Sequence, residues 1–190
     1  LGGTPIPFGP PNPVDSPTLE GPLYPGVTTV ELTDVDDTAS LVTVFSEALG
    51  MSIGSVTGPF SGGAATVTVQ PMTDGDTIRA TQTVGGIESC LSAGLVVGVT
   101  GVTLPDIVVP GQTSVEVSDL AEGLAEQVTV YHLVSEGNYE VLGSVANPTT
   151  DPVTVPTTTL VDGWVIVATQ TIDEIEGPDS NAVTVAVPAP

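Results

Sequence analysis

Residues 74–83 read Asp-Gly-Asp-Thr-Ile-Arg-Ala-Thr-Gln-Thr, and residues 162–171 read Asp-Gly-Trp-Val-Ile-Val-Ala-Thr-Gln-Thr. Each copy is a turn signal, Asp-Gly, followed by a run of residues that favour strands. A second turn and the dipeptide Ile-Glu, at residues 87–88 and 175–176, complete each copy. The chain is therefore a tandem repeat of one β-rich unit.

Composition supports strands in both copies. The 190 residues include 22 Gly and 18 Pro, the residues that separate many short strands. Hydrophobic residues make up 40% of the chain, so each half can bury a core, although aromatic residues are only 4%. No apolar stretch approaches the roughly 18 residues of a membrane span, so we expect no membrane-spanning segment.

Alternating residues predict a similar series of strands in each repeat. Val115 and Val117, for example, alternate with polar residues, as expected of a strand with one buried face. The expected strands lie near residues 18–23, 27–33, 40–46, 51–57, 64–70, 76–83 and 94–99, and near 105–109, 112–118, 126–134, 139–145, 152–156, 163–171 and 181–187. Short strands at this spacing are typical of an immunoglobulin-like β-sandwich. We expect an all-β protein of two tandem immunoglobulin-like domains, residues 18–98 and 99–190, after an extended N-terminal arm of residues 1–17.

The arm is rich in Pro and Gly and has too little apolar content to order itself. Proline cannot donate ladder hydrogen bonds, which favours an extended conformation over a regular strand. We expect the arm to pack on its own domains or in a groove of a neighbouring subunit, as in strand-addition assemblies. Its anchors would be Ile6, Phe8 and Val14.

The repeat motif also carries a resemblance to a known family. Asp-Gly-x-x-Ile-x-Ala-Thr-Gln-Thr-x-x-x-Ile-Glu is followed by a last strand such as residues 181–185, Asn-Ala-Val-Thr-Val. Over roughly residues 20–187 this pattern resembles the immunoglobulin-like repeats of prokaryotic secreted and cell-surface proteins, among them adhesins and surface-appendage proteins. The resemblance implies a sandwich fold and an extracellular location, but such repeats serve as stalks, fibre subunits and binding modules alike.

The acidic charge of the chain excludes two classes of partner. One basic residue, Arg79, stands against 23 acidic residues, and the net charge is −22. Nucleic acids and anionic membrane surfaces are excluded, because both bind through cationic side chains. The charge suits solubility by self-repulsion, binding of divalent cations or high salt, and a lineage-wide bias in composition explains it equally well.

No set of residues points to catalysis or to a zinc site. His132 is the single histidine and lies inside the strand-like run 128–134, without a nucleophile motif. Cys90 is the single cysteine, so no internal disulfide can form. We therefore expect a protein that is not an enzyme and has no cofactor other than a metal ion.

Acidic clusters are the one chemical signal in the sequence. Carboxylates that converge from several loops suit Ca²⁺, which takes about 6–8 oxygen ligands. In a sandwich of this topology, two loops of the second repeat share the pole that faces the first repeat. The resulting Ca²⁺ candidates are Asp74, Asp76, Asp119, Glu122, Asp173 and Glu174. Solvated turn residues are the alternative, because no regular calcium-binding motif is present.

One strand of the second repeat is apolar on both faces. Val165 and Val167 occupy the positions that Thr77 and Arg79 hold in the first repeat. Because the repeats share a fold, the difference predicts that another subunit or an N-terminal arm covers Val165 and Val167. The alternative is that β-branched residues are tolerated on an exposed sheet face.

These observations lead to two hypotheses about function. The first is a structural subunit of an extracellular filament or surface appendage, a homopolymer assembled through the arm and the domain faces. The second is a binding or stalk module of a larger cell-surface adhesin, which recognises a glycan or a protein. Both place the protein outside the cell or at its surface.

Overall fold

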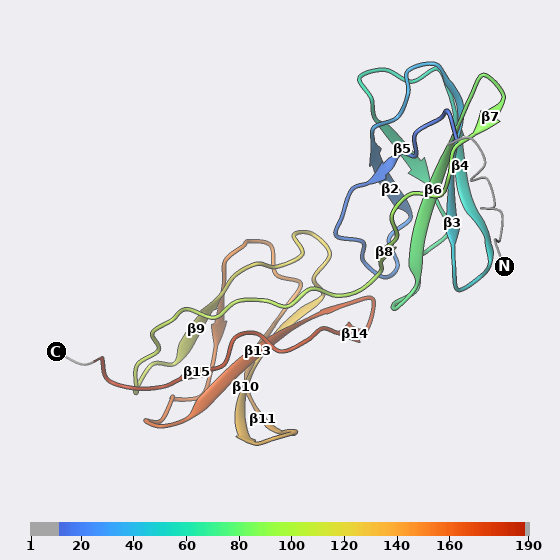
Figure 1. Ribbon diagram of the computed structural model, residues 1–190. Helices are drawn as coiled ribbons and strands as arrows, with labels where there is room; N and C mark the ends of the chain where they lie inside the picture. The colour runs from blue at the N-terminus through green and yellow to red at the C-terminus, as the bar shows by residue number, and fades with distance from the viewer. Residues whose placement is uncertain (1–11, 189–190) are drawn as a thin grey trace, which may run out of the picture. The chain divides into compact units, whose positions relative to one another are not determined.

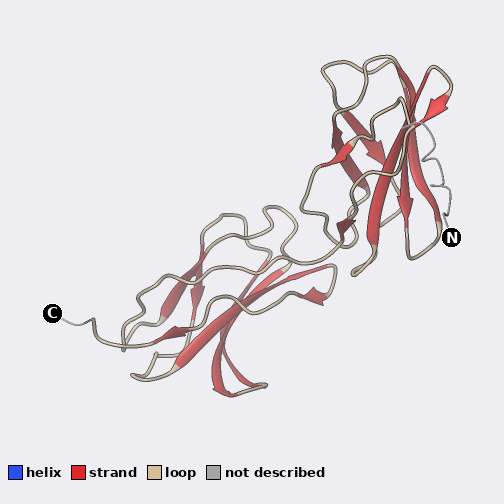
Figure 2. Cartoon of the chain, in the orientation of Figure 1, coloured by secondary structure: helices blue, strands red, loops and turns tan. Residues whose placement is uncertain are grey.

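The computed structural model describes residues 12–188, and within that range it contains strands and no helix (Figure 1, Figure 2). Consistent with this, no helix in the described part of the chain is long and apolar enough to cross a membrane. The described residues form two compact units. Unit 1 comprises residues 12–23 and Val27–Val97, and unit 2 comprises Tyr24–Gly26 and residues 98–188.

Unit 1 is a sandwich of two antiparallel sheets. One sheet has the order β1-β2-β5, and the other has the order β4-β3-β6-β7, with β8 also paired to β6. The strands are β1 (Thr18–Leu19), β2 (Thr29–Thr33), β3 (Ala39–Ser46), β4 (Met51–Thr57), β5 (Ala65–Thr68), β6 (Thr77–Val84), β7 (Ile87–Glu88) and β8 (Leu95–Val96).

Unit 2 repeats this arrangement. Its sheets have the orders β12-β9 and β11-β10-β13-β14, with β15 also paired to β13. An isolated bridge between Thr103 and Ser118 takes the place of β1. The strands are β9 (Ser114–Val117), β10 (Gln127–Ser135), β11 (Asn138–Ala146), β12 (Val153–Pro156), β13 (Val165–Ile172), β14 (Ile175–Glu176) and β15 (Val183–Thr184).

Alternating side chains place a separate core inside each sandwich. In β2, Val30 and Leu32 are buried, whereas Thr29 and Glu31 are exposed, and β9 shows the same pattern. Successive side chains of a strand point to opposite faces, so one face of each sheet is apolar and packs on the other sheet. Each unit has its own cluster of buried apolar residues. The expected fold, all-β with tandem immunoglobulin-like sandwiches, is confirmed.

Several expected strands are shorter than the sequence indicated; those at 94–99 and 181–187, for example, are reduced to β8 and β15. The expected strand at 105–109 contributes one bridge, between Val108 and Val185. Pro105 and Pro110 flank this bridge and have no N–H to donate to a ladder. The expected strand at 18–23 is reduced to β1 and a bridge from Leu23 to Val97, with a proline between them. Two short strands that were not expected, β7 and β14, close hairpins with β6 and β13.

Those two hairpins have the same loop length and different turn residues. Gly85 and Gly86 connect β6 to β7 with φ of 59° and 82°. Asp173 and Glu174 connect β13 to β14 with φ of 52° and 63°. A two-residue hairpin loop favours positive φ at both positions, which glycine adopts without strain and a residue with a Cβ atom does not. The turn in unit 2 is therefore strained where the turn in unit 1 is not.

Candidate functional site

The glutamine of the repeated Ala-Thr-Gln-Thr motif is structural in both units. Gln82 in β6 is 2% exposed, and its Nε2 donates a 2.9 Å hydrogen bond to the carbonyl oxygen of Asp15. Gln170 in β13 is 0% exposed, and its Nε2 donates a 2.9 Å hydrogen bond to the carbonyl oxygen of Thr100. Both Oε1 atoms accept a hydrogen bond from a backbone N–H, in the loop that follows β2 in unit 1 and in the loop that follows β9 in unit 2. The motif therefore ties the segment that enters each sandwich to its sheet.

Residues 12–17 belong to unit 1 and are held by it. Besides the bond to Gln82, Asn12 donates a 2.8 Å hydrogen bond to the backbone of β7. Val14 is half-buried and lines a hollow on its own sandwich. Ile6 and Phe8, the other two residues that we expected to anchor the arm on a neighbouring subunit, lie outside the described residues.

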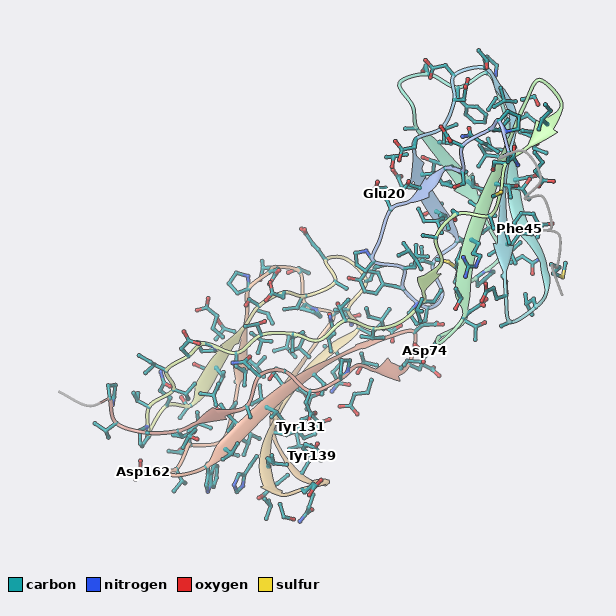
Figure 3. The ribbon with its side chains drawn as sticks, viewed as in Figure 1. Glu20, Phe45, Asp74, Tyr131, Tyr139 and Asp162 are labelled. Atoms are coloured by element: carbon teal, nitrogen blue, oxygen red, sulfur yellow. The ribbon has the colours of Figure 1, made fainter. Side chains whose placement is uncertain are left out.

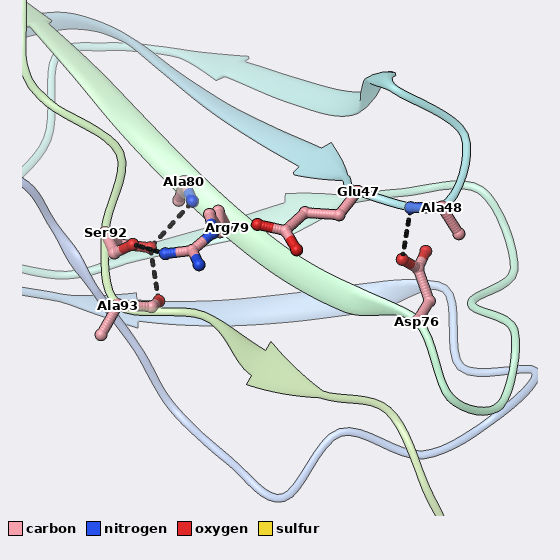
Figure 4. Close-up of polar contacts among 7 residues, drawn as sticks. All are labelled: Glu47, Ala48, Asp76, Arg79, Ala80, Ser92 and Ala93. Atoms are coloured by element: carbon pink, nitrogen blue, oxygen red, sulfur yellow. Dashed lines mark hydrogen bonds and ion pairs between the residues drawn. The ribbon is translucent and has the colours of Figure 1, made fainter.

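The calcium candidates include one buried structural residue. Asp76 is 6% exposed and accepts a 2.9 Å hydrogen bond from the N–H of Ala48 (Figure 4). It also accepts a hydrogen bond from the hydroxyl of Ser46, so it stabilises the turn between β3 and β4. Asp173 and Glu174 form the turn between β13 and β14.

The remaining candidates, Asp74, Asp119 and Glu122, are exposed. Among residues 12–188, no group of three or more His, Cys, Asp or Glu side chains is placed to hold a metal ion. Calcium binding stays a prediction. Chelation at fixed ionic strength lowers the melting temperature if these carboxylates bind Ca²⁺ and leaves it unchanged if they do not.

Val165 and Val167 lie on the outer face of β13, as expected, but the chain itself covers Val167. Val167 is 2% exposed, whereas Val165 is half-buried. Val167 lies directly opposite Tyr131 of β10. On the other side of β13, the N–H of Ser180 donates a 2.8 Å hydrogen bond to the carbonyl oxygen of Ala168, so the chain after β14 runs beside the strand. The prediction that a partner buries Val167 is wrong, because its own sheet neighbours already do so.

The outer face of β10 and β11 carries an apolar and aromatic surface, which we call the tyrosine face: Tyr131, Leu133, Tyr139 and Val141. The register pairs Tyr131 with Val141 and Leu133 with Tyr139. Residues directly opposite each other in antiparallel strands point to the same side of the sheet. Tyr139 is 42% exposed and Val141 is 59% exposed, so the face is accessible to a partner.

A hollow of about 220 Å³ opens beside the tyrosine face, with carboxylates in its wall. The hydroxyl of Tyr131 donates a 2.6 Å hydrogen bond to Oε1 of Glu176, and the hydroxyl of Tyr139 donates a 2.7 Å hydrogen bond to Oδ2 of Asp179. Thr169 donates a further 2.7 Å hydrogen bond to Oε1 of Glu176. The two tyrosine rings lie edge to face with centroids 5.8 Å apart (Figure 3). The hollow thus combines two aromatic rings with two fixed carboxylates.

The surroundings keep both tyrosines protonated. Burial raises the pKa of Tyr131, and the hydrogen bond to Glu176 and its negative charge raise this pKa further. The pKa of Tyr139 is raised first by its hydrogen bond to Asp179 and then by burial and by nearby negative charge. Both hydroxyls therefore act as donors, and the potential in the hollow is negative.

The same face of unit 1 is more polar and contains its own cation. On this face, Phe45 lies opposite Ser52 of β4 and Arg79 of β6. These are the register positions at which Tyr131 lies opposite Val141 and Val167 in unit 2. The guanidinium of Arg79 pairs with Glu47 and donates a 2.8 Å hydrogen bond from Nη1 to a backbone carbonyl before β8 (Figure 4). The two units therefore share a fold and differ in the chemistry of this face.

His132 packs as an aromatic ring. It stacks on Trp164 with centroids 4.5 Å apart and an interplanar angle of 16°. Its Nδ1 atom is buried and, among the described residues, has no hydrogen-bond partner; the carboxylate of Glu140 is 3.8 Å away.

Sequence reasoning did not identify Tyr131, Tyr139 or Asp179. They could have been found by comparing the two repeats residue by residue along the neighbouring strands as well, as was done for the strand that contains Val165. The motif glutamate Glu176 was noted as part of the repeat, and its counterpart Glu88 likewise accepts a hydrogen bond from a motif threonine, Thr81, at 2.8 Å.

Similarity searches add no family assignment. No protein-family model matches the sequence, and no curated protein matches it. A similar solved structure is a biofilm-associated protein, BSP domain, with 20% identity and a TM-score of 0.41 over 92% of this chain and 30% of that one. Another is a two-domain fibronectin type III segment of chicken tenascin, with 16% identity and a TM-score of 0.37 over 91% of this chain and 100% of that one.

A third is the ectodomain of the polymeric Ig receptor of a teleost fish, with 14% identity and a TM-score of 0.45 over 91% of this chain and 99% of that one. All three TM-scores are below 0.5, so the fold assignment rests on the strand order and register of the chain itself.

Proposed function

We propose that the chain is a binding module of an extracellular or cell-surface protein, and that the tyrosine face of unit 2 contacts a protein partner. The observation that carries the proposal is the difference between two units of one fold. Unit 1 presents Ser52 and Arg79 at positions where unit 2 has Val141 and Val167. Because both sandwiches form with either set of residues, the apolar face of unit 2 is not a requirement of the fold.

The composition of the face fits an interface. Tyrosine is enriched in protein interfaces, because its ring buries a large area while its hydroxyl keeps a hydrogen-bond partner. Complete burial of a side chain such as Val141 contributes about 1.5–3 kcal/mol. The exposed surfaces of Tyr139 and Val141 are the part of the tyrosine face that a partner would cover.

The extracellular location rests on the resemblance of the repeats to those of prokaryotic cell-surface proteins and on the acidic composition. A net charge of −22 with a single basic residue opposes binding to anionic intracellular polymers. A module of this kind takes a protein or a glycan as its ligand, and the apolar tyrosine face favours a protein.

Binding to cells tests the proposal. Fluorescently labelled chain is added to cells of the source organism, and saturable binding is measured by flow cytometry. We expect the double variant Tyr139→Ser, Val141→Thr to lose most of this binding. Met51→Thr is the matched control, because Met51 is an exposed apolar residue at the start of β4, the strand that corresponds to β11. Equal binding by the wild type and both variants would exclude the tyrosine face as the contact surface.

A filament subunit is the second candidate, because an exposed apolar sheet face also suits contacts between copies of one chain. Residues 12–17 do not favour this alternative, since they are tied to their own sandwich through Asp15 and Asn12. Electron microscopy of the purified chain separates the two candidates. Ordered polymers that disappear in the Tyr139→Ser, Val141→Thr variant support the filament, and monodisperse particles support the binding module.

A further inference from the structure

We propose that the hollow lined by Tyr131, Tyr139, Glu176 and Asp179 binds a cationic side chain, arginine or lysine, of the protein partner. The inference rests on the proposed function and specifies the ligand chemistry of the same face. The four side chains come from β10, β11 and the chain from β14 onward. Their rings and carboxylates line one hollow of about 220 Å³.

The carboxylates have unused acceptor capacity. Glu176 receives its two side-chain hydrogen bonds at Oε1, and Asp179 receives one at Oδ2. Within residues 12–188, no side chain donates a hydrogen bond to Oε2 of Glu176 or to Oδ1 of Asp179. The tyrosine and threonine donors fix the carboxylates without neutralising them, so a cation in the hollow would meet two oriented negative charges.

The aromatic rings add a second attraction for a cation. A guanidinium or ammonium group over the face of a tyrosine is attracted by the ring quadrupole when it lies within about 6 Å of the centroid. Tyr139 is 42% exposed, so part of its surface is open to a ligand. The edge-to-face contact with Tyr131 holds the two rings at 70° to each other, and both tyrosines line the hollow.

Unit 1 shows how the same face accommodates a guanidinium. Arg79 of β6 takes the register position of Val167 in β13, and its guanidinium lies between Glu47 and a backbone carbonyl before β8. In unit 2, a valine at this position leaves the face without an internal cation, Leu133 takes the place of Glu47, and the carboxylates at the hollow are Glu176 and Asp179. An external cation would balance Glu176 and Asp179, for which unit 2 has no Lys or Arg side chain of its own.

Charge also determines where the cation comes from. The sequence has one Lys or Arg in 190 residues, Arg79, and this side chain is already paired with Glu47. A second copy of residues 1–190 therefore has no free Lys or Arg side chain to insert, which favours a partner of different sequence as the source of the cation. A neutral glycan could stack on the tyrosines, but it would desolvate two carboxylates without compensating their charge.

The test is an NMR titration of the whole isotope-labelled chain with Nα-acetylarginine amide and with its neutral citrulline counterpart. We expect saturable amide shifts at Tyr131, Tyr139 and Glu176 with the arginine probe, and at least a fivefold weaker response to citrulline. Glu176→Gln and Asp179→Asn should each weaken binding about two- to fivefold. Glu88→Gln in unit 1 is the matched control and should leave the titration unchanged, since Glu88 accepts the corresponding threonine hydrogen bond.

Equal shifts with citrulline, shifts spread over the acidic residues of both units, or no shift at the hollow would each overturn the inference. The same is true if maltotriose binds at the hollow and the arginine probe does not. The spectrum of each variant shows whether it is folded, and the comparison of the two probes on the wild type does not depend on any variant. If the tyrosine-face variant loses cell binding while the arginine probe fails, the proposed function stands and the cation inference fails. If cell binding is also unchanged, both fail.

Discussion

The Nε2 atom of Gln170 lies 2.9 Å from the carbonyl oxygen of Thr100 and donates a hydrogen bond to it. The two residues are far apart in the sequence, and the bond is formed inside unit 2, where Gln170 has no exposed surface. Gln82 and Asp15 form the equivalent bond in unit 1. A buried amide that satisfies backbone groups of the entering segment explains why this residue is identical in the two repeats.

Replacing this glutamine should destabilise its own unit. Gln170→Leu leaves the N–H of Ala121 and the carbonyl oxygen of Thr100 without their partner, at about 1–3 kcal/mol for each buried group. We expect the free energy of unfolding of unit 2 to fall by about 2–4 kcal/mol. Trp164 is the single tryptophan and lies in unit 2, so its fluorescence in a urea titration reports this transition. Gln82→Leu is the control and should leave the Trp164 transition unchanged.

Replacing the two turn residues between β13 and β14 should stabilise unit 2. Asp173 and Glu174 both have positive φ, which costs a residue with a Cβ atom about 1–2 kcal/mol. The double substitution Asp173→Asn, Glu174→Gly introduces the pair that this turn type favours. We expect the urea midpoint of the Trp164 transition to rise by the equivalent of about 1–2 kcal/mol. An unchanged or lower midpoint would show that these side chains stabilise the turn in another way.

Alkaline pH should lower the free energy of unfolding of unit 2 through ionisation of Tyr131. The folded-state pKa of Tyr131 is raised by burial and then by Glu176, so the native state keeps a phenolic proton that the unfolded chain loses at about pH 10. This contribution to stability is complete below the unfolded pKa and is lost as the pH rises through the folded pKa. The urea midpoint of the Trp164 transition should therefore fall above about pH 10, and the fall should be shallower in Tyr131→Phe. Identical slopes for the two proteins would contradict the assignment.

The strands could be predicted because alternation is a local signal. Val115 and Val117 point inward in β9, as their spacing indicates, and the two copies of the motif both form the long strands β6 and β13. Residues 105–109 form a single bridge and no strand, because Pro105 and Pro110 have no N–H to donate to a ladder.

The proposed binding surface depends on contacts that are not local in sequence. The burial of Val167 depends on its pairing with Tyr131, and the hollow depends on Glu176 and Asp179 meeting tyrosines of β10 and β11. A register shift between Val130 and Tyr131 in the pairing with β11 decides which residues share the tyrosine face, and a glycine lies at this shift in both units, Gly143 and Gly54. The comparison of the two repeats pointed to the outer face of β13 through Val165 and Val167, and the tyrosine face that we propose as the contact surface lies beside it on β10 and β11.

The most direct test of the binding role is photo-crosslinking from the tyrosine face on intact cells. Benzoylphenylalanine replaces Val141 in one protein and Ser52, its counterpart in the register of unit 1, in another. We expect one dominant crosslinked product from position 141 and no such product from position 52. Excess unmodified wild-type chain should remove the product, whereas excess of the Tyr139→Ser, Val141→Thr chain should not. Equal products from both positions, or none from position 141 under conditions in which the chain binds to cells, would contradict the proposed binding role.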